Sequence, residues 1–297
     1  MEDFVNAIAF PAPRLPKSFY AETLLSRNDL VWLRTSLDER IPALHLRAPV
    51  ASKKPQGRGL TILYAHGNAE DLGLHVQFVE AMARKTGCDV FSFEYVGYGL
   101  SGHEGGRASE DACYRSIAAA WTYLSQKVDP STILVYGRSI GTGPAVDLCA
   151  GAASPRGLLL QSPFESGLRC AFGYVTSVLL SGCDIFRNYE KIDKVSCPIA
   201  IVHGTEDTVV PIAGARTLLD LARNAGNTLV RELFLTGYGH NDMPYPQVFR
   251  FLHDEFLKDI NTQLRQQQQR KILDNNQQQS LQAKIISTPR EKTNMDS

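Results

Sequence analysis

Apolar runs alternate with amphipathic segments along most of this chain. The runs are short and rich in Leu, Ile, Val and aromatic residues, which is typical of strands covered on both faces. Between them, apolar residues recur at helical spacing, as at Leu74, Phe78 and Met82. We therefore expect an α/β domain with a mostly parallel central sheet and helices on both of its faces. Its strands are predicted at residues 31–34, 41–47, 60–65, 89–95, 133–137, 157–162, 199–203 and 232–235.

One of these strands leads directly into a Gly-x-Ser-x-Gly motif, Gly137-Arg138-Ser139-Ile140-Gly141, and a run of small residues follows. A turn this sharp leaves no room for side chains two residues from the serine on either side, so both positions are glycine. The turn exposes the serine hydroxyl at the end of the sheet. It also points the first N–H groups of the next helix toward whatever the hydroxyl attacks. The motif predicts Ser139 as a nucleophile.

Two later strands end beside an acid and a histidine. Residues 199–203 run into His203-Gly-Thr-Glu206-Asp207, and residues 232–235 run into the glycine-rich loop Gly237-Tyr-Gly-His240. The chain order Ser139, Asp207, His240, each just past the end of a strand, is the order of the α/β-hydrolase triad. His240 is then the general base and acid, and Asp207 orients its imidazole. This constellation argues against the alternative that Ser139 is an ordinary helix cap.

Other residues of the same types have simpler explanations. Glu165 follows the preceding strand and is the alternative acid, whereas Glu206 should point away from the site. His66 and His203 end strands in His-Gly pairs, where a histidine commonly packs and orients a loop. The remaining histidines are expected to be ordinary surface or half-buried residues: His45, His75, His103 and His253.

The oxyanion hole is expected to use two backbone N–H groups. One belongs to Ile140, directly after the nucleophile, and the other to Asn68 in the loop His66-Gly-Asn-Ala69. No metal is expected, because His, Asp and Glu do not recur at the spacing of a zinc site. No cofactor is expected either, because no Gly-rich phosphate loop opens a βαβ unit.

The composition favours one ordinary globular domain in a reducing compartment. The 297 residues include 31 basic and 31 acidic side chains, a balance that gives no general attraction to nucleic acid or to an anionic membrane. The six cysteines are scattered and are expected to be free thiols rather than disulfides: Cys88, Cys113, Cys149, Cys170, Cys183 and Cys197. We see neither a signal peptide nor an N-terminal lipidation motif nor a membrane-spanning segment. The expected location is therefore cytoplasmic, with any residence at membranes peripheral.

Three regions are expected along the chain. Residues 1–21 form a proline-containing arm, residues 22–262 form the α/β-hydrolase domain, and residues 263–297 form a glutamine-rich tail. The tail has few apolar residues, so we expect disorder beyond about Leu273. The segment from Phe164 to Cys197 is too short for a large lid, which leaves a short cap and a shallow site.

Several motifs together resemble the alpha/beta hydrolase domain-containing protein 17 family, over roughly residues 32–257. They are His66-Gly-Asn-Ala-Glu-Asp-Leu-Gly73, Phe91-Ser-Phe-Glu-Tyr-Val-Gly-Tyr-Gly99, Tyr136-Gly-Arg-Ser-Ile-Gly-Thr142, Phe186-Arg-Asn-Tyr-Glu-Lys-Ile-Asp-Lys-Val195, His203-Gly-Thr-Glu-Asp207 and Gly239-His-Asn-Asp242. The resemblance implies a serine hydrolase that removes palmitate from the cysteines of membrane-associated proteins. Its partners would be S-palmitoylated proteins or other acyl-ester substrates, and its membrane contact would be transient.

Two features depart from that family. Its members carry an N-terminal cluster of palmitoylated cysteines, whereas the first cysteine here is Cys88, and they usually have glutamine where Arg138 precedes the serine. Thioesters, oxygen esters and amides are cleaved by the same triad, so the sequence does not choose among them. A general carboxylesterase or lysophospholipase is the alternative enzyme. A non-catalytic scaffold that binds partners through the tail is the alternative outside catalysis.

Overall fold

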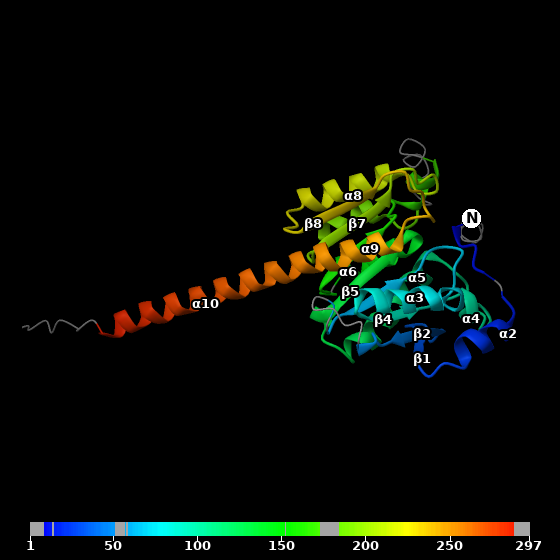
Figure 1. Ribbon diagram of the computed structural model, residues 1–297, viewed down its shortest axis with the longest axis horizontal. Coiled ribbons are helices and arrows are strands. Elements are labelled where there is room, and N and C mark those ends of the chain that lie inside the picture. The colour runs from blue at the N-terminus through cyan, green and yellow to red at the C-terminus, as the bar shows by residue number, and fades with distance from the viewer. Residues whose placement is uncertain are drawn as a thin grey trace, which may run out of the picture.

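A computed structural model describes residues 9–13, 15–50, 57, 59–151, 153–172 and 184–287. Two predicted regions lie partly outside these residues: the predicted arm, in its residues 1–8, and the predicted cap, in residues 173–183, which include Cys183. The described residues contain one sheet, which lies between two layers of helices (Figure 1).

The sheet has the order β1-β2-β4-β3-β5-β6-β7-β8. Its strands are β1 (Leu30–Arg34), β2 (Arg40–Leu46), β3 (Thr61–Ala65), β4 (Asp89–Phe93), β5 (Ile133–Arg138), β6 (Gly157–Gln161), β7 (Ile199–Gly204) and β8 (Val230–Leu235). The pairs β1–β2 and β2–β4 are antiparallel and all the others are parallel. This topology confirms the α/β-hydrolase fold that was expected from the strand pattern.

The inner strands are buried on both faces because alternate side chains enter two separate apolar cores. In β5, Ile133 and Val135 belong to one core and Leu134 and Tyr136 to the other. Helices α5 (Glu110–Ser125), α6 (Thr142–Ala150) and α8 (Ile212–Asn224) cover the first face. The second is covered by α3 (Leu72–Thr86), α9 (Tyr245–Arg250) and a π-helical turn, Phe251–Phe256.

Capping residues explain where two of the helices begin and where one of them ends. In α3, the Asp71 side chain accepts the N–H of Leu74, and Gly87 ends the helix with a left-handed backbone, φ 72°. In α5, Ser109 accepts the N–H of Ala112. Shorter helices at the edges are α2 (Lys17–Tyr20), a π-helical turn at Ala21–Leu25, and α4 (Gly99–Gly102).

The last helix, α10 (Leu257–Ser287), projects away from the sheet as a long rod (Figure 1). Among its described side chains, Leu257 and Ile260 are buried, whereas Ile272 and Leu273 are about 60% exposed. The helix continues past Leu273, where we expected disorder, because Gln, Lys and Arg are good helix formers even without a core to pack on. The division of the chain into arm, domain and tail stays a prediction.

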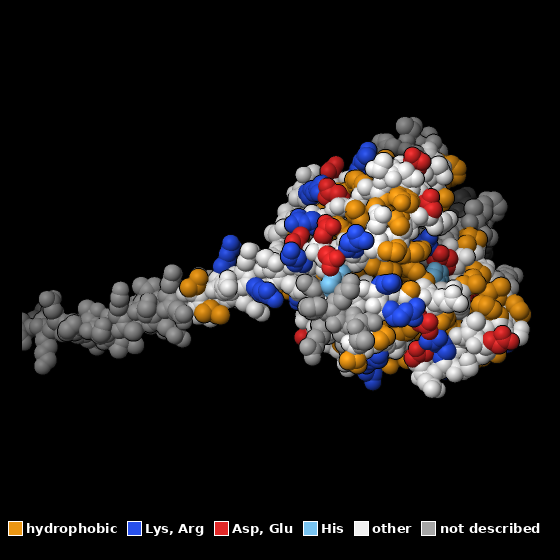
Figure 2. All heavy atoms as spheres, in the orientation of Figure 1, with side chains coloured by type: hydrophobic (Ala, Val, Ile, Leu, Met, Phe, Trp, Pro, Cys, Tyr) orange, Lys and Arg blue, Asp and Glu red, His pale blue; other side chains and the backbone are white. Residues whose placement is uncertain are grey.

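The surface mixes both signs of charge. Basic and acidic side chains are interspersed with apolar ones on the face shown in Figure 2, in keeping with the formal net charge of zero. Within the described ranges, no helix combines the length and the apolar character needed to cross a bilayer. The described cysteines are unpaired thiols, as expected: Cys88, Cys113, Cys149, Cys170 and Cys197.

Candidate active site

The turn after β5 holds Ser139 in a strained backbone conformation. Its φ of 52° lies in the left-handed region, which non-glycine residues rarely adopt. A Cβ added at Gly137 would lie 2.5 Å from the carbonyl oxygen of Gly141, and one at Gly141 would lie 2.2 Å from that of Ala65. Both glycines are therefore required by close backbone contacts, which is the physical reason for the motif.

The structure brings together the three residues predicted from different strands. His240 Nε2 lies 3.0 Å from Ser139 Oγ, and His240 Nδ1 lies 2.7 Å from Asp207 Oδ2. A carboxylate only accepts hydrogen bonds, so Nδ1 carries the proton of the neutral imidazole and Nε2 accepts from the serine hydroxyl. A continuous chain of hydrogen bonds thus joins Asp207 to Ser139.

Asp207 is held in place by its own turn. Its Oδ1 accepts the N–H groups of Val209 at 3.0 Å and Val210 at 2.7 Å. Its Oδ2 also lies 3.3 Å from Nε2 of buried His203, which donates to the Val210 carbonyl at 2.9 Å. Burial by itself would raise the pKa of Asp207. The hydrogen bonds from His203, His240 and the backbone outweigh burial and hold that pKa well below its usual value.

The competing acids are placed elsewhere. Glu165 Oε2 accepts from Arg169 at 2.7 Å, and the Arg169 guanidinium stacks 3.5 Å from the centre of the Tyr189 ring. Glu206 is exposed while the adjacent Asp207 is buried. The hydrogen-bond partners of the His240 ring are Asp207 and Ser139, and neither glutamate is among them.

The two backbone groups expected to form the oxyanion hole lie on neighbouring loops. Strands β3 and β5 are parallel neighbours in which Ala65 pairs with Gly137, so both following loops leave the same edge of the sheet. The close approach of Gly141 to the carbonyl oxygens of Ala65 and His66 shows that the turn containing Ile140 packs against the end of β3. That these N–H groups bind an oxyanion stays a prediction.

The side chain of Asn68 has a separate role. Its Nδ2 donates to the carbonyl of Ala9 at 2.7 Å, and its Oδ1 accepts from the Tyr98 hydroxyl at 2.6 Å. The N-terminal arm is thereby attached to the loop that was expected to supply an oxyanion donor. The apolar arm sequence alone gave no sign of this contact, because its partner is far away along the chain.

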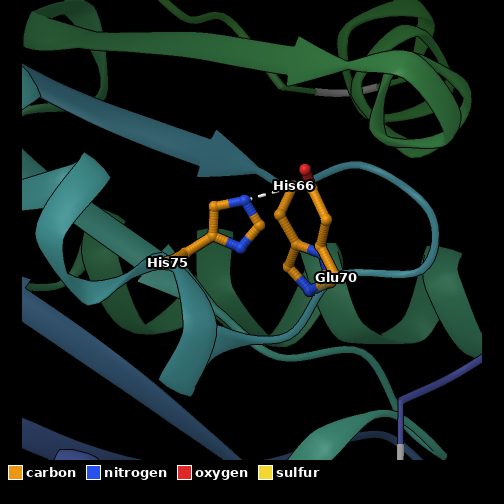
Figure 3. Close-up of side chains that lie close together, drawn as sticks. All are labelled: His66, Glu70 and His75. Carbon is orange, nitrogen blue, oxygen red and sulfur yellow. Dashed lines mark ion pairs between the residues drawn. The ribbon is translucent and has the colours of Figure 1, made fainter. Parts of the chain in front are cut away.

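Three residues beside the site lie close enough to bind a metal ion. The ligand atoms of His66, Glu70 and His75 lie within 4.8 Å of one another (Figure 3). Each of these atoms already has a protein partner, however. His66 Nδ1 bonds the Gly67 carbonyl and its Nε2 bonds Glu94, both at 2.9 Å. Glu70 contacts His75 on one oxygen and the Arg138 guanidinium on the other, so the cluster is a hydrogen-bonded network.

His75 and His253 were therefore wrongly expected to be surface or half-buried residues. His75 is buried within this network, and His253 is buried in the π-helical turn Phe251–Phe256. The sequence held one signal of this network: Arg138 is a charged residue at the end of the apolar run Ile133-Leu-Val-Tyr-Gly137.

Comparison with known proteins gives related sequences and related folds. A family model described as serine aminopeptidase, S33, matches residues 58–169. The chain is 35% identical to alpha/beta hydrolase domain-containing protein 17C of Mus musculus over 226 residues, which cover 75% of this chain and 66% of that protein. It is 36% identical to protein 17B of Homo sapiens over 212 residues, 71% of this chain and 68% of that protein. The matches thus span slightly less than two thirds of the mouse protein and slightly more of the human one.

The solved structures most useful for comparison show the fold alone. An esterase of Pyrococcus furiosus superposes with a TM-score of 0.61 at 18% identity, over 84% of this chain and 98% of that chain. A puromycin-hydrolyzing peptidase of Mycobacterium tuberculosis gives 0.62 at 16% identity, over 84% of this chain and 41% of that chain.

Proposed function

This chain belongs to the alpha/beta hydrolase domain-containing protein 17 family and is a serine hydrolase of the α/β-hydrolase fold; on that premise we propose that it cleaves palmitoyl thioesters on S-acylated proteins. The proposal rests on one observation above all, the hydrogen-bonded series Ser139, His240 and Asp207 at the carboxyl edge of the sheet.

The first half-reaction acylates the enzyme. His240 Nε2 takes the proton of Ser139 as Oγ attacks the thioester carbonyl, and the negative charge develops on the carbonyl oxygen. The N–H groups of Ile140 and Asn68 would stabilise this oxyanion. The intermediate collapses with cleavage of the carbon–sulfur bond, and the imidazolium returns the proton to the departing cysteine sulfur. The products are a free protein thiol and palmitoyl-Ser139.

The second half-reaction regenerates the enzyme. His240 removes a proton from water as the water oxygen attacks the acyl carbonyl, and it then gives that proton to Ser139 Oγ. Palmitic acid is released, and it loses its remaining proton to solvent to give palmitate. Throughout, ionised Asp207 keeps the proton of His240 on Nδ1 and stabilises the imidazolium that forms twice in the cycle.

Ser139→Ala tests the nucleophile. We expect this variant to lose labelling by a fluorophosphonate probe and to lose several orders of magnitude in turnover, because the attacking oxygen is gone. Circular dichroism and the thermal melting midpoint serve as controls for folding. Undiminished labelling of the folded variant would contradict the assignment.

The substrate class needs a separate measurement. A palmitoylated-peptide thioester and p-nitrophenyl acyl esters of several chain lengths are compared by kcat/KM. The proposal predicts a clear preference for the long-chain thioester. A preference for short oxygen esters would instead identify a general carboxylesterase and would leave the Ser139 assignment intact.

A further inference from the structure

A buried guanidinium directly before Ser139 contacts both loops that border the site. Arg138 is the last residue of β5 and is 4% exposed. Its NH1 group pairs with Glu70, in the loop between β3 and α3. Its NH2 group donates to Asn241 Oδ1 at 2.8 Å, and Asn241 directly follows His240. We call these three side chains the Arg138 bridge.

Glu70 is firmly held on its own side of the bridge. Its Oε2 accepts the N–H of Gly67 at 3.0 Å and lies 2.8 Å from His75 Nε2 (Figure 3). Burial raises the pKa of Glu70, but His75 and Arg138 outweigh burial and hold it at about 2. The carboxylate is therefore charged at neutral pH and meets the buried charge of Arg138.

The bridge lies directly against the backbone that leads to Asn68. A Cβ added at Gly67 would lie 2.8 Å from Glu70 Oε2 and 2.9 Å from Arg138 NH1. Because these side chains lie so close, the Gly67 backbone has little room to move unless the Glu70–Arg138 ion pair moves with it. One side chain thus links the loop of the expected oxyanion donor to the loop of the general base.

We propose that Arg138 is a positioning residue that fixes the His240 loop relative to Ser139 and the Asn68 loop. This inference rests on the proposed hydrolase function, because it concerns the geometry of that reaction. Arginine suits the task, since its planar fork offers separate N–H donors to a carboxylate and to an amide oxygen. A glutamine at this position would carry no charge to pair with Glu70.

The test measures three variants. Arg138→Gln removes the positive charge and the guanidinium fork, Arg138→Lys keeps a positive charge but not the fork, and Asn241→Ala removes the far contact. Each is assayed for kcat and KM on the best ester substrate, and for hydrogen exchange of the peptide 237–243. We expect Arg138→Gln to lower kcat about 10- to 100-fold with KM changed less than about threefold, because a small displacement of the base is costly. Exchange in peptide 237–243 should accelerate.

Coupling between the two contacts separates positioning from general loss of stability. The double variant Arg138→Lys with Asn241→Ala should be no worse than Arg138→Lys alone, because lysine has already lost the contact with Asn241. Arg115→Gln is the matched control. It breaks another partly buried ion pair, at 2.8 Å, between α5 and Glu39 in the turn that joins β1 to β2. It should lower the melting temperature without changing kcat or the exchange of peptide 237–243.

Two outcomes would overturn the proposal: a folded Arg138→Gln with wild-type kcat and wild-type exchange, or losses from Arg138→Lys and Asn241→Ala that simply add. If Arg138→Gln does not fold, the same judgement is made on Asn241→Ala. A wild-type protein that no fluorophosphonate probe labels would instead refute the hydrolase function. The bridge would then be judged by the exchange measurement alone.

Discussion

Individual residues at this site combine a strained backbone with a buried, hydrogen-bonded charge. Ser139 keeps a positive φ, and Asp207 satisfies both carboxylate oxygens with two backbone N–H groups and two histidines. Backbone strain and buried charge both cost free energy, so their occurrence together at one edge of the sheet supports a functional role for that edge.

At this scale the first prediction concerns the acid. Asp207→Asn should lower turnover by about 10⁴-fold, because an amide no longer holds the reactive tautomer of His240. Glu165→Gln should change turnover less than about threefold, since Glu165 pairs with Arg169 instead. Steady-state kinetics on both folded variants checks this. A large loss in Glu165→Gln with little in Asp207→Asn would transfer the role to Glu165.

A second residue prediction concerns acid stability. The pKa of Glu70 is about 2 in the folded protein, below its ordinary value of 4.5, so the unfolded chain takes up this proton first as the pH falls. The contribution of Glu70 is therefore complete above about pH 4.5 and is lost between about pH 4.5 and 2. Glu70→Gln should lose less stability than the wild type across this window, as measured by urea unfolding at each pH. Parallel stability curves would show that Glu70 gains nothing from its partners.

At the scale of elements, the described beginning of the N-terminal arm, Ala9 and Phe10, packs against the loops around the site. The ring of Phe10 is 5% exposed and packs edge-on against Phe186, with the ring centres 5.9 Å apart. The preceding carbonyl, of Ala9, accepts from Asn68. The arm thereby connects the loop after β3 with the segment that precedes β7.

The arm should accordingly contribute to stability. Phe10→Ala should reduce the free energy of unfolding by about 3 kcal/mol, because it leaves a cavity among aromatic rings. Phe172→Ala is the matched control, since that ring is 61% exposed and its loss should cost less than about 0.5 kcal/mol. Chemical denaturation of both variants checks the difference. Equal costs would mean that Phe10 is not packed as described.

At the scale of the whole molecule, the parallel sheet forms the site from distant parts of the chain. The loops after β3, β5, β7 and β8 contribute Asn68, Ser139, Asp207 and His240 to one edge. Helix α10 leaves this body after its first turns, and Ile272 and Leu273 stay exposed on it. Folding of the body should therefore not depend on most of that helix.

Truncation after Arg270 tests this independence. The shortened chain should keep its melting temperature within about 1 °C and its ester hydrolysis within about twofold, because the removed part adds little buried apolar surface. Far-UV circular dichroism should show the lost helical signal. A marked fall in the melting temperature would show that the far end of α10 packs on the body.

The sequence by itself determined the features that depend on neighbouring residues. In the part of the chain that the structure describes, apolar runs predicted each strand, although the strand expected to reach Tyr95 ends at Phe93. The glycines around Ser139 predicted the sharp turn, because a missing Cβ is a local requirement. The order of Ser139, Asp207 and His240 predicted which side chains meet, since the carboxyl ends of parallel strands share one edge.

Only the tertiary structure decided which partners the remaining charged residues take. It joined Asn68 to Ala9 and put Arg138 between Glu70 and Asn241. No local pattern specifies such pairs, because a long side chain reaches whatever the fold brings within a few ångströms of it. Glu70 lies 68 positions before Arg138 in the chain, and Asn241 lies 103 positions after it. Both reach Arg138 because the sheet places the ends of β3, β5 and β8 at the same edge.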